Sequence, residues 1–334
     1  MDTAAKPTLA QAMEAGPVVL DGGMSNQLEA AGHDLSDALW SARLLADRPE
    51  AIRQAHAAYF AAGAQVAITA SYQATFEGFA RRGVGREEAA RLLRRSVELA
   101  REAAALSDFA GRVSTLMPGA AGRGEARGPL SGSDGRDRDR HRWVAASVGP
   151  YGAMLADGSE YRGRYGLSIA SLERFHRPRI EALAAAAPDV FALETVPDLD
   201  EAAALLRIVD SLGLPAWLSF TISGDRTRAG QPLADAFALA AASPHVIAVG
   251  VNCCAPGDVE AAVKLAAAAT GKPVVAYPNS GESWDGAARA WQGSNTFDTG
   301  AARRWVGHGA RLVGGCCRVG PAGIGRLAAA LITG

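Results

Sequence analysis

The chain has 334 residues, of which 49% are hydrophobic, and its formal net charge at pH 7 is −1. This length is enough for one large core, and the near-neutral charge argues against a nucleic-acid or membrane-surface role. The first residues do not combine a basic segment with an apolar one, and no uncharged stretch has the pattern of a membrane span. We therefore expect a cytoplasmic protein in a reducing compartment.

Short apolar or β-branched segments recur along the chain between Ala- and Leu-rich segments with helical spacing. Nearly continuous apolar segments are typical of parallel strands buried on both faces. Alternation of strands and helices predicts one (β/α)8 barrel over residues 1–334, with an open doubly wound sheet as the alternative. No glycine-rich nucleotide motif follows the first strand, which weakens a nucleotide-binding version. The expected strands are 17–20, 65–69, 143–148, 189–194, 215–220, 245–252, 273–277 and 311–315.

Between the first two strands the sequence predicts an amphipathic helix. Asp47 is expected to be its N-cap, Pro49 lies in its first turn, and Gly63 ends it. Its apolar stripe consists of Ile52, Ala55, Tyr59 and Phe60.

Residues 109–142, just before the third strand, interrupt this pattern. They include seven Gly and seven Arg, with almost no large apolar residue after Met117. Such a segment buries too little surface to offset the entropy of ordering it. We expect a flexible surface insertion.

All four cysteines form two adjacent pairs at the ends of strand-like segments. In a (β/α)8 barrel these ends meet at one mouth, so Cys253, Cys316 and Cys317 could together bind zinc and leave one position open. Gly314 and Gly315 would allow the bend that two adjacent ligands require. Buried core thiols and a vicinal redox pair are the alternatives, and Cys254 is expected to be a core thiol.

Two carboxylates, Asp21 and Glu194, end the first and fourth strands. Free N–H groups at Gly22 and Gly23 would form a nest for a carboxylate beside them. Acceptors for an ammonium group next to donors for a carboxylate describe an amino-acid pocket, although capping and structural roles are an open alternative.

Several other polar residues allow two interpretations. Asn252 and Asn279 are either hydrogen-bonding supports for the site or simple strand-end turns, and Asn252 is also predicted to bind substrate. The aromatic residues either line the pocket or pack beside it, and the two helical histidines are expected to be packing or surface residues. These residues are Tyr72, Tyr151, Tyr161, His56 and His176.

With these residues in place, the chain resembles the homocysteine S-methyltransferases, and within them the bacterial and plant branch that uses S-methylmethionine as methyl donor. The similarity extends nearly from end to end, with only 109–142 outside it. The segments that carry it are LDGGMSNQLEAAGHDLSDALWSARLL, VAITASYQAT, SVGPYGAMLADGSEYRG, FHRPRIEAL, LETVPD, GVNC, AYPNSGE and GGCCR.

The resemblance implies a zinc-dependent (β/α)8 barrel with one Zn²⁺ per chain. In the family the cysteines of GVNC and GGCC bind zinc, here Cys253, Cys316 and Cys317. The aspartate of LDGG and the glutamate of the LET motif, here Asp21 and Glu194, hold the amino group of homocysteine. Mild departures from the family pattern, at Met24, Ser25 and Cys254, affect no ligand position.

The implied reaction is methyl transfer from S-methylmethionine, or alternatively S-adenosylmethionine, to the thiol of L-homocysteine, which forms methionine. Three thiolates on a divalent ion give a net charge of −1, which suits a cationic sulfonium donor. Betaine as donor, or another thiol or a selenol as acceptor, would use the same fold. Two rivals of another class are a non-catalytic zinc-stabilised binding protein, with Cys254 as fourth ligand, and a vicinal-thiol redox enzyme. Only small-molecule partners are expected, and the choice between monomer and homo-oligomer stays open.

Overall fold

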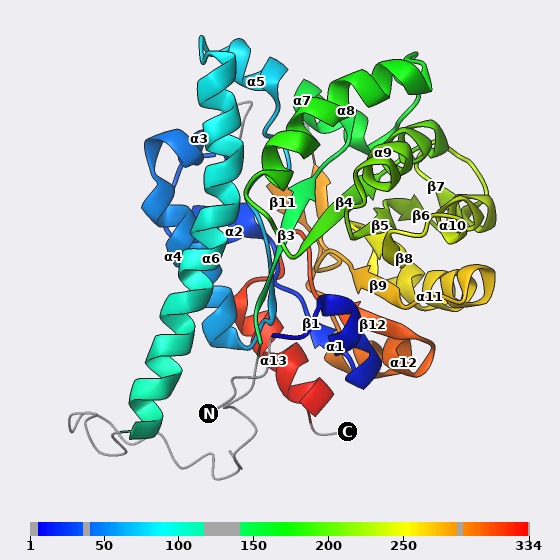
Figure 1. Cartoon of the computed structure of the whole chain (residues 1–334). Coiled ribbons are helices and arrows are strands. Elements are labelled where there is room, and N and C mark those ends of the chain that lie inside the picture. Colours follow the sequence, from blue (N-terminus) through cyan, green and yellow to red (C-terminus); the bar gives the residue numbers. More distant parts are fainter. Residues whose placement is uncertain (1–5, 36–40, 117–140, 286–289, 333–334) are drawn as a thin grey trace.

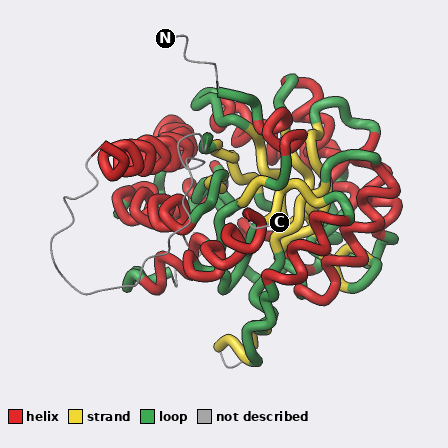
Figure 2. Tube along the Cα trace, turned by 90° about the horizontal axis from the view of Figure 1, so that it is seen from below, coloured by secondary structure: helices red, strands yellow, loops and turns green. Residues whose placement is uncertain are grey.

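Eight parallel strands surrounded by helices form the centre of the computed structural model, which describes residues 6–35, 41–116, 141–285 and 290–332 (Figures 1 and 2). Each barrel strand falls within one of the segments expected from the sequence or extends one by a residue or two. The strands are β1 (Val18–Val19), β2 (Val66–Ile68), β3 (Trp143–Val148), β4 (Val190–Val196), β5 (Ala216–Phe220), β8 (Val246–Asn252), β9 (Val274–Tyr277) and β12 (Ala310–Val313).

The strands close into a barrel rather than an open sheet. Their order is β1-β12-β9-β8-β5-β4-β3-β2, and neighbouring strands pair in parallel. A parallel bridge between Leu20 and Val66 joins the first strand to the last, and the N–H of Asp21 donates to the carbonyl oxygen of Val66 at 3.1 Å. The (β/α)8 prediction is confirmed.

Helices cover the outside of the barrel, and none of those in the described part combines the length and apolarity needed to cross a bilayer. Two small hairpins, β6 (Ile222–Ser223) with β7 (Arg226–Thr227) and β10 (Ser283–Asp285) with β11 (Ala290–Gln292), were not expected from the sequence. The helices are α1 (Leu9–Ala15), α2 (Met24–Ala30), α3 (Ser41–Asp47), α4 (Pro49–Ala62), α5 (Phe76–Ala80), α6 (Arg86–Leu116), α7 (Tyr151–Leu155), the 3₁₀ turn η2 (Ser159–Tyr161), α8 (Ile169–Ala184), α9 (Leu199–Leu212), α10 (Leu233–Ala241), α11 (Pro256–Thr270), α12 (Thr299–Gly307) and α13 (Pro321–Ile332).

Helix α4 matches its predicted stripe and its end but not its cap. Gly63 has a left-handed φ of 108°, as a terminating glycine should, and all four stripe residues are buried. Asp47 as N-cap was wrong, because it is the last residue of α3, and Arg48 is the cap without a side-chain hydrogen bond.

The structure describes only the two ends of the segment 109–142. Helix α6 extends to Leu116, and at the other end the guanidinium group of Arg142 lies 5.4 Å from the ring centroid of Phe60. Residues 117–140 lie outside the described residues, and their flexibility stays a prediction.

The barrel interior is filled by alternate residues of the strands. Because successive side chains of a strand point to opposite faces, every second residue faces inward. Leu9 and Met13 of α1, which lies at the lower end of the barrel in Figure 1, pack against this interior and seal it. The interior layer contains Val18, Leu20, Val66, Trp143, Ala145, Val190, Ala192, Trp217, Ala248, Val275, Tyr277 and Leu312.

Gly250 of β8 tests this packing. A Cβ atom there would lie 1.9 Å from the carbonyl oxygen of Val275, a backbone atom that cannot move aside. We expect Gly250→Ala to destabilise the protein by about 3 kcal/mol or more and to lower the Tm measured by calorimetry. Gly257→Ala in α11, where no atom lies within 4 Å, should leave the Tm unchanged or slightly raised. Equal Tm values for the two variants would contradict this account.

Candidate active site

The upper interior layer of the barrel, at the carboxyl ends of the strands, is polar. Ser147, Glu194 and Ser219 each follow an apolar inward residue of their strand by two positions, and Tyr277 follows Val275 in the same way. All four side chains are nearly or fully buried. The mouth of the barrel therefore begins as a layer of hydrogen-bonding groups on a hydrophobic base.

Glu194 occupies the middle of this layer. One carboxylate oxygen accepts a hydrogen bond from the hydroxyl of Ser147, and the other accepts one from the hydroxyl of Tyr277 at 3.0 Å. Trp217 Nε1 donates to the Tyr277 hydroxyl, also at 3.0 Å, which fixes that ring. Burial raises the pKa of Glu194 to about 7, although hydrogen bonds from Ser147 and Tyr277 oppose the shift.

Asp21, at the end of the first strand, has one oxygen that accepts a hydrogen bond and one that has no hydrogen-bond partner. Its Oδ2 accepts from the N–H of Ile68 at 2.9 Å, whereas Oδ1 is buried without a hydrogen-bond partner. Burial raises the pKa of Asp21 well above its ordinary value, and the nearby charge of Glu194 raises it further. A cation bound near these two buried carboxylates would stabilise their ionised forms.

Three of the four cysteines meet at the same mouth. The Sγ atoms of Cys253, Cys316 and Cys317 all lie within 4.8 Å of one another. Cys253 and Cys316 are paired as a disulfide with a Cα–Cα distance of 5.6 Å, and Cys317 is free. The separation expected between thiolates of a tetrahedral zinc site is about 3.8 Å, so the reduced cluster fits such an ion with a small adjustment. Cys254 packs in the outer hydrophobic cluster, as expected.

Backbone conformation and hydrogen bonds from backbone N–H groups fix the two turns that carry the cysteines. Cys253 follows the inward end of β8 with a φ of 47°, which turns the chain back over the mouth. The N–H of Cys316 donates to the carbonyl oxygen of Pro278 at 2.7 Å, and the N–H of Cys317 donates to Asn279 Oδ1 at 3.2 Å. Asn279 is thus a support for the cysteine turn.

The glycines near the site act through close contact rather than through unusual dihedral angles. A Cβ at Gly314 would lie 2.6 Å from Cβ of Leu20, and one at Gly22 would lie 2.1 Å from the Val319 carbonyl oxygen. Positive φ in this turn falls on Arg318 instead. The prediction that unusual dihedral angles at Gly314 and Gly315 permit the bend was therefore wrong.

Two expected substrate contacts are occupied by the protein itself. The N–H of Gly23 donates to the carbonyl oxygen of Val319 at 3.0 Å, so it cannot complete the nest expected with Gly22. Asn252 is fully buried, and its Oδ1 accepts from the N–H of Thr195 at 2.7 Å while Nδ2 donates to Thr195 Oγ1 at 2.8 Å. Asn252 therefore positions the residue after Glu194, and direct binding of substrate by Asn252 stays a prediction.

Arg179 is a supporting residue that the sequence alone did not reveal. Its buried guanidinium group donates to the carbonyl oxygens of Tyr72 at 3.0 Å and Gly149 at 3.2 Å, which ties together the loops after β2 and β3. His176, one helical turn earlier, contacts Glu201 at 2.8 Å in the packing role expected for it. Ser147 and Tyr277 could have been predicted from the sequence, because each follows an inward-facing apolar residue of its strand by two positions.

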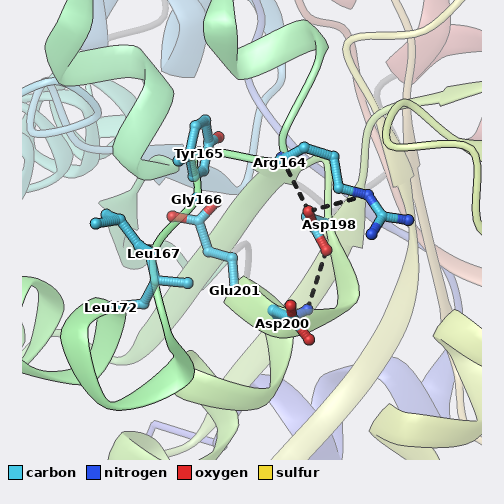
Figure 3. A pocket seen from close by; sticks show the side chains of 8 residues that line it. All are labelled: Arg164, Tyr165, Gly166, Leu167, Leu172, Asp198, Asp200 and Glu201. Carbon is cyan, nitrogen blue, oxygen red and sulfur yellow. Dashed lines mark hydrogen bonds and ion pairs between the residues drawn. The ribbon is translucent and has the colours of Figure 1, made fainter.

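A cavity of about 250 Å³ lies beside the mouth and includes none of the expected site residues (Figure 3). Arg164 contacts Asp198 along its rim, and the other lining residues come from the loop before α8 and from the start of α9. It is lined by Arg164, Tyr165, Gly166, Leu167, Leu172, Asp198, Asp200 and Glu201.

A parallel barrel whose carboxyl mouth gathers three sulfur atoms and two buried carboxylates defines a barrel enzyme with a cysteine-lined active site. The chain belongs to the homocysteine S-methyltransferase family, whose sequence model matches residues 18–331. It is 42% identical over 316 residues to homocysteine S-methyltransferase YbgG of Bacillus subtilis, which covers 93% of each chain.

Solved structures agree with this assignment. The metallated form of the homocysteine methyltransferase MmuM of Escherichia coli superposes with a TM-score of 0.77 at 41% identity, covering 94% of this chain and 96% of that one. The oxidised form superposes with a TM-score of 0.79 at 40% identity, covering 97% and 99%. The resemblance inferred from the sequence motifs is confirmed.

Proposed function

We propose that the protein transfers a methyl group from S-methylmethionine to the thiol of L-homocysteine, with zinc held by Cys253, Cys316 and Cys317. The observation that carries the proposal is the meeting of three cysteine sulfurs within 4.8 Å at the mouth that also holds two buried carboxylates. The names of the relatives support the acceptor, and the existence of a metallated form of the E. coli relative supports a metal.

Asp21 and Glu194 suit the ammonium group of the acceptor. The free Oδ1 of Asp21 can accept a hydrogen bond, and the charges of both groups become favourable once a cation lies between them. Ser147 and Tyr277 hold the Glu194 carboxylate in place, so the substrate meets a preformed site. Gly22 is the remaining candidate for the acceptor's carboxylate.

Zinc in the three-cysteine cluster would lower the pKa of the acceptor thiol, so that its sulfur is a thiolate at neutral pH. As the new bond from the homocysteine sulfur to the methyl carbon forms, the bond from that carbon to the donor sulfonium sulfur breaks. The electron pair stays on the donor sulfur, which becomes a neutral thioether, and the thiol proton is released. Both products are then methionine.

The geometry disfavours a structural zinc site. A closed structural zinc site needs a fourth protein ligand, and Cys254 packs in the outer cluster away from the other three sulfurs. A vicinal redox enzyme, with Cys316 and Cys317 cycling, predicts activity without metal, so removal of the metal decides against or for that rival.

The metal assignment predicts that Cys316→Ser loses zinc and activity together. One of three thiolates disappears, so affinity for the ion falls while the barrel, which does not depend on that side chain, stays folded. Zinc content of the reduced protein, circular dichroism and methionine formation check this. Cys254→Ala is the matched control and should retain one zinc per chain. Full activity in metal-free protein would refute the proposal.

The acceptor assignment predicts a pH effect. With a pKa of about 7, Glu194 is protonated in the free enzyme at lower pH and offers the ammonium group no charge. We expect kcat/KM for homocysteine to fall as the pH drops through about 7. Glu194→Gln should lower kcat/KM about 10- to 100-fold at higher pH and should not show this decline.

Titration of homocysteine itself affects the pH profiles of the wild type and of Glu194→Gln equally. The difference between the two profiles therefore reports the enzyme alone. Glu181→Gln, which removes an exposed helical carboxylate, is the control and should follow the wild-type profile. An unchanged KM for homocysteine in Glu194→Gln would count against the assignment.

The donor is tested by competition. Reduced, zinc-loaded protein receives homocysteine with equal concentrations of S-methylmethionine, S-adenosylmethionine and betaine, each carrying a distinct isotope in its methyl group. We expect the label of S-methylmethionine to dominate the methionine formed. Dominance of the betaine label would overturn the donor assignment, because betaine lacks the sulfonium leaving group.

A further inference from the structure

One buried carboxylate near the mouth has no role in the proposed function. Glu160, in the 3₁₀ turn η2, is only 6% exposed, and its Oε2 has no hydrogen-bond partner. No ion pair to Glu160 occurs among the described residues. A buried carboxylate without a counterion costs free energy, so the position favours a cationic partner from outside the chain.

Glu160 lies close enough to the sulfur cluster for its charge to act on Cys317. Burial raises the pKa of the neighbouring Tyr161 hydroxyl, and the charge of Cys317 raises it further. Burial raises the pKa of the Cys317 thiol to about 11, and the charge of Glu160 raises it as well, as it does for the buried Tyr72 hydroxyl. The turn η2 packs against β4, the strand that carries Glu194.

A positive group lies on the other side of Tyr161. Arg228 Nε donates to the carbonyl oxygen of Tyr161 at 3.2 Å, and its guanidinium carbon lies 5.9 Å from the centroid of the Tyr161 ring. The side chain is exposed, and no carboxylate pairs with it among the described ion pairs. Its remaining N–H groups are therefore available to an anion at the rim.

We propose that Glu160 and Arg228 bind the two charged groups of an amino-acid methyl donor, Glu160 its α-ammonium group and Arg228 its α-carboxylate. The inference rests on the proposed function and specifies its donor half. Asp21 and Glu194 serve the acceptor, so the two amino acids would have separate binding groups around the three sulfur atoms. Tyr161, whose backbone carbonyl oxygen accepts from Arg228, directly follows Glu160 in the chain.

The test separates the two substrates. Glu160→Gln should raise the KM for S-methylmethionine about 10- to 100-fold, as expected for loss of a hydrogen bond between charged groups. The KM for homocysteine should change less than about twofold. Asp225→Asn, which removes an exposed negative charge beside Arg226, is the control and should change neither KM.

A sulfonium donor that lacks the amino group, dimethylsulfoniopropionate, distinguishes recognition from a structural effect. Wild type and Glu160→Gln should use it with equal kcat/KM, because Glu160 then has no ammonium group to bind. A second variant, Arg228→Gln, alters an exposed side chain that the fold does not need. It should raise the KM for S-methylmethionine and for dimethylsulfoniopropionate, since both carry a carboxylate.

Equal increases of both substrate KM values in Glu160→Gln, or an unchanged donor KM, would overturn the inference. So would an unchanged donor KM in Arg228→Gln if the first variant does not fold. Absence of methyl transfer from any sulfonium donor to wild-type protein would instead refute the proposed function.

Discussion

The active site depends on how Glu194 is held at the top of the barrel interior. A carboxylate at this depth is stable only because Ser147 and Tyr277 donate to it and because Trp217 fixes Tyr277 from below. These residues reach one layer because each lies an even number of positions beyond an apolar inward residue. The period of the strands therefore produces both the dry interior and the polar floor of the site.

Backbone conformation then brings the sulfur atoms over this floor. Thr195 and Cys253 adopt positive φ angles of 57° and 47°, which are costly for side chains with a Cβ. Asn252 offsets the cost at Thr195 by bonding both its N–H and its hydroxyl. Gly22 and Gly314 permit contacts that any larger residue would prevent, so the loops after β1 and β12 lie against each other.

Much of this arrangement could be predicted from the sequence, because it follows from local pattern. Apolar segments indicated all eight strands, and the rule that strand ends share one mouth brought together Asp21, Glu194 and the three cysteines. The roles of Asn252 and Gly23 could not be predicted, since they depend on which groups the folded chain already satisfies. Glu160 could not be predicted as a site residue, because a single 3₁₀ turn is too short to show a periodic pattern in the sequence.

The two halves of the mouth differ in how they are built. Glu194 lies in β4 and Asp21 just after β1, and their hydrogen bonds also join parts of the barrel, so substitutions there affect the fold as well as the proposed acceptor site. Glu160 and Arg228 lie on connections between elements, where a change alters the rim while the barrel interior stays packed. A barrel of this design can therefore keep one acceptor while its loops adapt to different methyl donors. The physical reason is that the proposed acceptor residues are tied to the barrel strands, whereas the proposed donor residues lie in the segments that connect them.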